Sequence, residues 1–161
     1  MSGFRVGTGF DAHRLVPGRR LILGGVEVAH SRGLEGHSDG DCLVHALCDA
    51  LLGAAAEGDM GRHFPSADPQ WKDASGAIFL ERTVRLVGAR GFAVENVDVT
   101  VIAQEPVLAP YIEKMRASLG RGLALETERV SVKAKSTDGL GATGRGEGIA
   151  AIATVLLRRK E

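Results

Sequence analysis

Three residues with metal-binding side chains, Asp11, His13 and His45, are the first candidates for chemistry in this sequence. Asp11 and His13 are two positions apart, and alternate side chains of a strand point to the same face. On an extended segment the carboxylate and the imidazole would therefore lie together, and a helix could bring His45 to them. One carboxylate and two imidazoles that leave a fourth position open are typical of catalytic zinc. The spacing predicts an enzyme that binds an anionic oxygen at a metal.

Two further carboxylates share one face of a predicted helix with His45. Asp41, His45 and Asp49 follow each other at intervals of four, within about 80° of arc, opposite a stripe of leucines. They could form an ordinary solvated polar face. Alternatively, a carboxylate beside a ligand histidine could fix the tautomer of its ring. The spacing leaves both interpretations open.

A glycine-rich segment near the C-terminus, STDGLGATGRGEG, is the next candidate. Its glycines satisfy the pattern GxGxxG after a predicted strand, but no helix opens behind them and no acidic residue follows about 20 positions on. A dinucleotide-binding site is therefore excluded, and no GK[ST] follows for a P-loop. The pattern could be only a flexible turn. Because Ser136, Thr137, Asp138 and Arg145 surround it, we expect a loop whose amides, hydroxyls and cation contact phosphate.

The elements that must position these residues alternate along the chain without a linker. Hydrophobic periodicity predicts strands over 4–10, 19–28, 92–104, 129–136 and 148–159, and helices over 39–58, 75–91 and 110–123. A turn is expected at Pro17–Gly18, and Ser38 or Asp39 is expected to cap the first helix. This order predicts an α/β fold of the α+β type, with one mixed β-sheet and helices packed on one face. Residues 1–161 are expected to form a single catalytic domain.

Charge, hydrophobicity and cysteine spacing argue against several kinds of partner and location for this chain. The 161 residues contain 20 Lys and Arg against 20 Asp and Glu, so a nucleic-acid partner or an acidic membrane has no electrostatic support. The sequence has no apolar run of roughly 18 residues and no signal-like start, which predicts a chain without membrane segments. The spacing of Cys42 and Cys48 is typical neither of a metal site nor of a disulfide. We expect both to be packing residues of one helix, and unpaired cysteines suit the reducing cytoplasm.

Four segments together resemble the 2-C-methyl-D-erythritol 2,4-cyclodiphosphate synthase family of the non-mevalonate isoprenoid pathway. They are GFDAHRL, LEGHSDGDCLVHALCDALLGAAAEGDMGRHFP, NVDVTVIAQEP and STDGLGATGRGEGIA, in this order over nearly the whole chain. The resemblance implies a lyase that closes 4-diphosphocytidyl-2-C-methyl-D-erythritol 2-phosphate to the cyclic diphosphate and releases CMP. It also implies a homotrimer with active sites between adjacent subunits. The implied cofactors are one Zn²⁺ per subunit and Mg²⁺ or Mn²⁺ bridging the substrate diphosphate.

The resemblance also implies roles for individual residues. The zinc ligands would be Asp11, His13 and His45, and the catalytic residues His37 and Ser136. Arg145 and Glu147 would approach the trimer axis, where the family can bind a prenyl diphosphate in a central cavity. The implied substrate contacts are Asp11, Ala12, His13, His37, Ser38, Asp59, Met60, Gly61, Phe64, Pro65, Ser66, Ala67, Asp68, Ala103, Gln104, Glu105, Pro106, Val107, Leu108, Ala109, Lys135, Ser136, Thr137, Asp138, Ala142 and Arg145.

The chain departs from the family pattern around the diphosphate. Asp138 stands where glutamate is usual at the second metal, so magnesium could bind there through water. Val107 stands where a lysine is common, and Lys135 and Ser136 replace threonines. We expect Lys135 to supply the phosphate cation that Val107 lacks.

Two other classes of function remain open at this point. A zinc phosphohydrolase would use the open metal position to activate water and would release a linear product. No additional carboxylate stands out as a base for that water. A non-catalytic protein that binds prenyl diphosphates around a structural metal would release no CMP.

Overall fold

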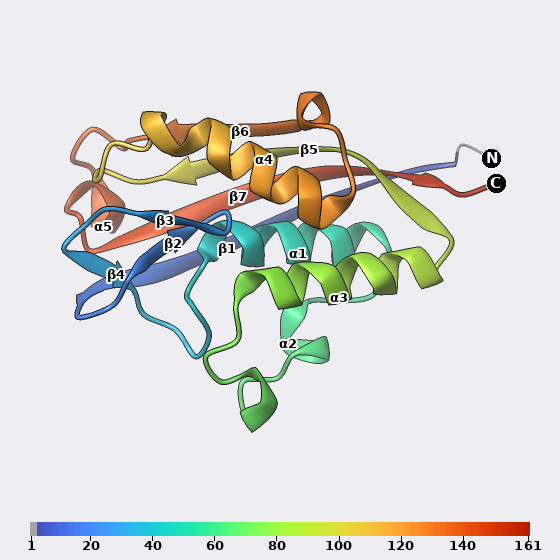
Figure 1. Ribbon diagram of the computed structural model, residues 1–161, viewed down its shortest axis with the longest axis horizontal. Helices are drawn as coiled ribbons and strands as arrows, with labels where there is room; N and C mark the ends of the chain where they lie inside the picture. The colour runs from blue at the N-terminus through green and yellow to red at the C-terminus, as the bar shows by residue number, and fades with distance from the viewer. Residues whose placement is uncertain (1–2) are drawn as a thin grey trace.

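A computed structural model describes residues 3–161 of the protein, and its centre is a five-stranded sheet (Figure 1). The strands are β1 (Phe4–Pro17), β4 (Arg32–Leu34), β5 (Phe92–Ile102), β6 (Val130–Lys135) and β7 (Gly148–Arg159), in the order β4-β1-β7-β5-β6. β5 and β6 pair in parallel, and the other neighbours pair antiparallel. The predicted mixed sheet is confirmed.

Three long helices cover one face of the sheet: α1 (Cys42–Ala54), α3 (Gly76–Ala89) and α4 (Ile112–Leu123). α1 packs on β1 and β7, and α4 packs on β6. Val97, Val99 and Val101 alternate inward from β5 and are buried under the helices, as period-2 patterning predicts. The shorter elements are α2 (Met60–His63), α5 (Gly141–Gly144) and the 3₁₀ turns Pro69–Trp71, Ala109–Tyr111 and Thr127–Arg129. The predicted placement of helices on one face is confirmed.

The single strand predicted over 19–28 is wrong. The segment forms two short strands, β2 (Leu21–Leu23) and β3 (Val26–Val28), which pair with each other in a separate sheet. Gly24 and Gly25 both have positive φ, at 59° and 72°, and reverse the chain between them. Only glycine adopts such angles without cost, so the two glycines end the strand that the flanking residues would continue.

The predicted bounds of the first strand and the first helix also need correction. β1 does not stop at residue 10 but continues through Asp11 and His13 to Pro17, because it pairs with β7 as far as Arg14. The helix predicted over 39–58 runs only from Cys42 to Ala54, and Asp41 caps it in place of Ser38 or Asp39. The Asp41 carboxylate accepts the Val44 N–H at 3.1 Å, a capping bond that only this position offers.

Two glycines let α1 lie directly against β1. A Cβ atom at Gly7 would be 2.0 Å from the Ala50 carbonyl oxygen, and one at Gly9 would be 2.0 Å from the Ala46 oxygen. Any larger residue would therefore push the helix away from the strand. This close approach sets the distance between His45 on the helix and the metal-binding residues of the strand.

The face of the sheet away from the helices carries exposed apolar side chains. Phe4, Val6, Phe10 and Ile152 are 57%, 67%, 60% and 40% exposed, which is unusual for large apolar residues of two paired strands. Across residues 3–161, none of the helices has both the length and the apolar character required to cross a bilayer.

Candidate metal centre

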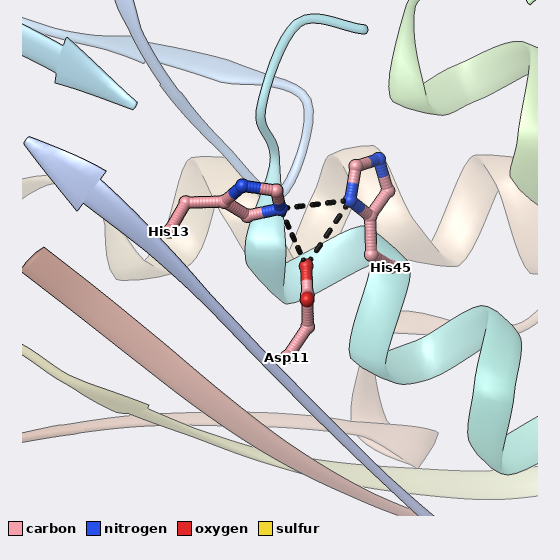
Figure 2. A group of neighbouring side chains, drawn as sticks. All are labelled: Asp11, His13 and His45. Atoms are coloured by element: carbon pink, nitrogen blue, oxygen red, sulfur yellow. Dashed lines mark hydrogen bonds and ion pairs between the residues drawn. The ribbon is translucent and has the colours of Figure 1, made fainter. Parts of the chain in front are cut away.

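Asp11, His13 and His45 meet at one point, as their spacing predicts (Figure 2). Asp11 Oδ2 lies 2.8 Å from His13 Nε2 and 3.1 Å from His45 Nδ1, and the two ring nitrogens are 3.3 Å apart. Ligand atoms held at about 2.0–2.1 Å from one tetrahedral ion lie roughly 3.3 Å from each other. The three side chains therefore fit a single divalent cation and leave a fourth position open. Within residues 3–161, no other group of three or more His, Cys, Asp and Glu side chains is arranged in this way.

Two elements and one loop hold this triad. Asp11 and His13 alternate onto the helix-covered face of β1, and His45 comes from the first turn of α1. The second ring nitrogen of His45, Nε2, lies 3.2 Å from Ser38 Oγ. Phe79 of α3 packs edge-on against the same ring, with centroids 5.7 Å apart. The ring is thus fixed from two sides with Nδ1 directed at Asp11.

The electrostatics of the triad suit a cation. Burial raises the pKa of Asp11, but hydrogen bonds from His13 and His45 outweigh it and hold the pKa well below its usual range. The hydrogen bond to Asp11 in turn raises the pKa of His13. Asp11 is therefore anionic at neutral pH, as a metal ligand must be, and a bound metal would displace any proton from His13.

Asp41 and Asp49 have structural roles. Asp41 is fully buried, and its carboxylate also accepts the N–H groups of Gly24 and Gly25 at 2.9 and 2.7 Å. Burial raises the pKa of Asp41 to about 6. Asp49 accepts the Met60 N–H at 2.8 Å and so holds α2. The solvated-face interpretation is thus wrong for Asp41. The partner of the second His45 ring nitrogen, Nε2, is the Ser38 hydroxyl and neither of these two carboxylates.

A cavity of about 280 Å³ opens beside the triad. It brings together seven of the residues expected at the site and two that the sequence analysis missed. Trp71 and Phe79 were missed because an aromatic residue in a loop or a helix has no spacing that distinguishes a cavity wall from the core. The lining residues are His13, His37, Ser38, His45, Met60, Phe64, Ser66, Trp71 and Phe79.

The two aspartates expected near this cavity cap short helical turns. The Asp59 carboxylate accepts the Arg62 N–H at 3.1 Å, and the Asp68 carboxylate accepts the Gln70 N–H at 3.0 Å. Each bond fixes the loop on which the residue lies. Gly61 lies in α2, and residues 65–67 form the exposed connection that follows it.

The remaining expected residues form a second group at the ends of β5 and β6. The Ala103 N–H donates to the Lys135 carbonyl at 2.9 Å, and the Gly139 N–H donates to Gln104 Oε1 at 3.1 Å, so the segments 103–109 and 135–138 lie side by side. Ser136 Oγ donates to Asp138 Oδ1 at 3.0 Å. Neither segment lines the 280 Å³ cavity. Within residues 3–161, this group and the metal triad therefore do not share that cavity.

The glycine-rich segment lies between the two groups. Ala142 borders a cavity of about 240 Å³ together with Ala12 and His13. Arg145 pairs with Glu147, with Arg145 Nε 2.6 Å from Glu147 Oε1, on an exposed surface. The chain thus places Ala142 near the metal triad and leaves Arg145 facing outward.

Comparison with known proteins gives full-length matches. The model of the YgbB family matches residues 4–158. The chain is 56% identical over 155 residues to the 2-C-methyl-D-erythritol 2,4-cyclodiphosphate synthase of Syntrophomonas wolfei. This match covers 96% of this chain and 99% of the relative.

Two solved structures are similar to this chain. The bifunctional IspDF from Campylobacter jejuni matches with a TM-score of 0.95 and 39% identity, over 98% of this chain and 43% of that longer protein. The CDP complex of IspF from Plasmodium falciparum matches with a TM-score of 0.87 and 31% identity, over 100% of this chain and 99% of that one.

Proposed function

The chain belongs to the YgbB family, and from this premise we propose that it converts 4-diphosphocytidyl-2-C-methyl-D-erythritol 2-phosphate to 2-C-methyl-D-erythritol 2,4-cyclodiphosphate and CMP. The enzyme is thus a lyase of non-mevalonate isoprenoid biosynthesis, and residues 1–161 act as one catalytic domain. The observation that carries the proposal is the triad Asp11, His13 and His45, which fits one divalent cation beside a cavity of about 280 Å³.

The reaction joins two anionic phosphates of one molecule. An oxygen of the 2-phosphate forms a bond to the β-phosphorus, the bond from that phosphorus to the bridging oxygen breaks, and CMP leaves with this oxygen. Two unit charges 4 Å apart repel each other by about 4 kcal/mol at an effective dielectric constant of 20. When bound, Zn²⁺ at the triad and Mg²⁺ or Mn²⁺ on the diphosphate would offset this repulsion and polarise phosphate oxygens.

The protein's own residues act mainly by positioning. A phosphate dianion is already a nucleophile, so no general base is required, and a bent substrate pose supplies much of the rate. His37 lines the cavity beside the triad and would donate to the reacting phosphate, while Ser136 would donate to the diphosphate. Asp138 is exposed and hydrogen-bonded to Ser136, an arrangement that suits an aspartate holding magnesium through water.

A complete site would need a second copy of the chain. The residues around the triad and those of 103–109 and 135–138 form separate groups within one protomer, and the exposed side chains of Phe4, Val6, Phe10 and Ile152 offer a surface for self-association. We therefore propose a homotrimer in which the triad of one subunit faces the cytidine-binding segments of the next. The solved CDP complex of a relative supports a cytidine nucleotide as the ligand. A prenyl diphosphate near Arg145 and Glu147 at the trimer axis remains a prediction.

One incubation tests the activity. The purified protein is mixed with the cytidylyl substrate, Zn²⁺ and Mg²⁺, CMP is measured by chromatography, and the second product is identified by phosphorus NMR. We expect CMP and a cyclic diphosphate, both lost when a chelator removes the metals. A linear product would instead identify a phosphohydrolase, and bound substrate without CMP release would identify a binding protein.

A further inference from the structure

Arg19 lies in the turn between β1 and β2 and reaches the loop that precedes α1. Its Nη2 donates to the Ser38 carbonyl at 2.7 Å, and its Nη1 donates to the Gly36 carbonyl at 3.3 Å. One guanidinium therefore bridges the carbonyls on both sides of His37. A planar group with donors in a fixed fork suits this task, and a lysine amine could not span both carbonyls in the same way.

The backbone that carries Arg19 is itself fixed. A Cβ atom on Gly33 of β4 would lie 2.2 Å from the Arg20 carbonyl oxygen and 2.5 Å from the Arg19 oxygen. The turn thus packs directly on the β4 backbone, and the half-buried Arg19 side chain extends from a rigid base. The next residue, Arg20, points away to Glu27 on the surface, with side chains 72% and 54% exposed.

The loop Gly36–Asp39, here termed the His37 loop, is also held by residues 73–76, which lead into α3. The Asp73 N–H donates to the His37 carbonyl at 2.9 Å, and the Asp39 N–H donates to the Ala74 carbonyl at 3.2 Å. The Asp39 carboxylate accepts the Gly76 N–H at 2.7 Å. Since Arg19 supplies the donors to the Gly36 and Ser38 carbonyls, its removal would leave these two carbonyls without those hydrogen bonds and the loop less firmly held.

We propose that Arg19 is a positioning residue of this site, which holds the His37 loop so that Ser38 fixes the His45 ring and His37 faces the cavity. Ser38 is 6% exposed, and its hydroxyl lies 3.2 Å from His45 Nε2, so a shift of the loop changes the orientation of a metal ligand. The effect on turnover rests on the proposed function. The effect on the metal site does not.

The test compares Arg19→Met and Arg19→Lys with the matched neighbour Arg20→Met. For each variant we would measure the zinc dissociation constant by chelator competition, the ¹⁵N resonances of the His45 ring in zinc-free protein, the urea midpoint, and kcat and KM for CMP release. Loss of a group hydrogen-bonded to a metal ligand typically weakens metal affinity or activity by about 10- to 100-fold, and because Arg19 acts one contact further out, through Ser38, the lower end of this range is expected. We expect this loss in zinc affinity and kcat for Arg19→Met with shifted His45 resonances, partial recovery in Arg19→Lys, and wild-type values for Arg20→Met.

Three results would overturn the proposal. The first is wild-type zinc affinity and wild-type His45 resonances in Arg19→Met. The second is a loss of zinc affinity in Arg20→Met as large as that in Arg19→Met. The third is a loss of zinc affinity in Arg19→Met that the lower stability, measured by the urea midpoint, accounts for in full. If the wild-type protein releases no CMP, the proposed function fails, while zinc affinity and the His45 resonances still decide the role of Arg19.

Discussion

Substituting Gly9 by alanine tests whether the contact between α1 and β1 sets the metal site. The new Cβ atom would lie 2.0 Å from the Ala46 oxygen and 2.6 Å from the Ala50 nitrogen. Non-bonded carbon contacts are comfortable only at about 3.5 Å, so the helix must move by roughly 1.5 Å at this point. Overpacking of this kind costs about 1–3 kcal/mol of folding free energy. His45, next to Ala46, would move with the helix.

A shift of this size exceeds what a metal site tolerates. Metal–ligand distances in zinc sites stay within about 0.2 Å of their ideal values. The ligand atoms of this triad are 2.8–3.3 Å apart, a spacing that a helix shift of roughly 1.5 Å would destroy. We therefore expect Gly9→Ala to weaken zinc binding by at least about 10-fold and to reduce CMP release in proportion. Gly7→Ala lies one turn further from His45, by Ala50 and Ala54, and is expected to destabilise the fold with a smaller effect on zinc.

The matched control is Gly53→Ala on the same helix, where an added Cβ atom would contact nothing within 4 Å. Alanine is favoured over glycine inside helices by up to about 1 kcal/mol, so this variant should be more stable with unchanged zinc affinity. Urea unfolding in the presence of a chelator gives the stability, and competition with a zinc-binding dye gives the affinity. Wild-type zinc affinity in Gly9→Ala would refute the reasoning, because His45 would then not depend on the close approach of the helix.

Four further outcomes are expected. His45→Ala should abolish CMP release while circular dichroism and the oligomeric state stay as in the wild type, and near-normal turnover would exclude the metal role. Lys135→Ala should raise KM for the substrate, whereas Lys114→Ala, on the exposed side of α4, should not; equal KM values would exclude the phosphate contact. Asp41→Ala should lower the free energy of unfolding in urea by about 2–4 kcal/mol, since the buried N–H groups of Gly24 and Val44 and the N–H of Gly25 lose their acceptor. Burial raises the pKa of Cys48 to about 12, so its thiol should react with a disulfide reagent only after unfolding.

The pH dependence of stability has one contribution with a clear sign. The pKa of Asp41 rises to about 6 from an ordinary value near 3.8, so the folded protein binds this proton more tightly than the unfolded chain does. The stabilising contribution of Asp41 to the free energy of unfolding is therefore fully present below about pH 4 and is lost as the pH rises through 6. Asp41→Asn should remove that slope from the pH profile of urea unfolding, and an unchanged profile would contradict the assignment.

The sequence by itself determined the alternation of elements and the three metal-binding residues. Period-2 alternation fixes which side chains of a strand share a face, so the common face of Asp11 and His13 follows from local geometry. Helical periodicity likewise located the helix that carries His45. These patterns are properties of adjacent residues and need no tertiary contact.

Only the tertiary structure decided how far apart these residues lie and what surrounds them. The residues next to Gly24 and Gly25 in the sequence do not indicate that a buried carboxylate, Asp41, accepts their N–H groups. The depth at which α1 sits depends on Gly7 and Gly9, some 40 residues away in sequence, because a missing side chain matters only when another backbone fills its space. Long-range packing therefore turned a predicted set of ligands into a site of defined size.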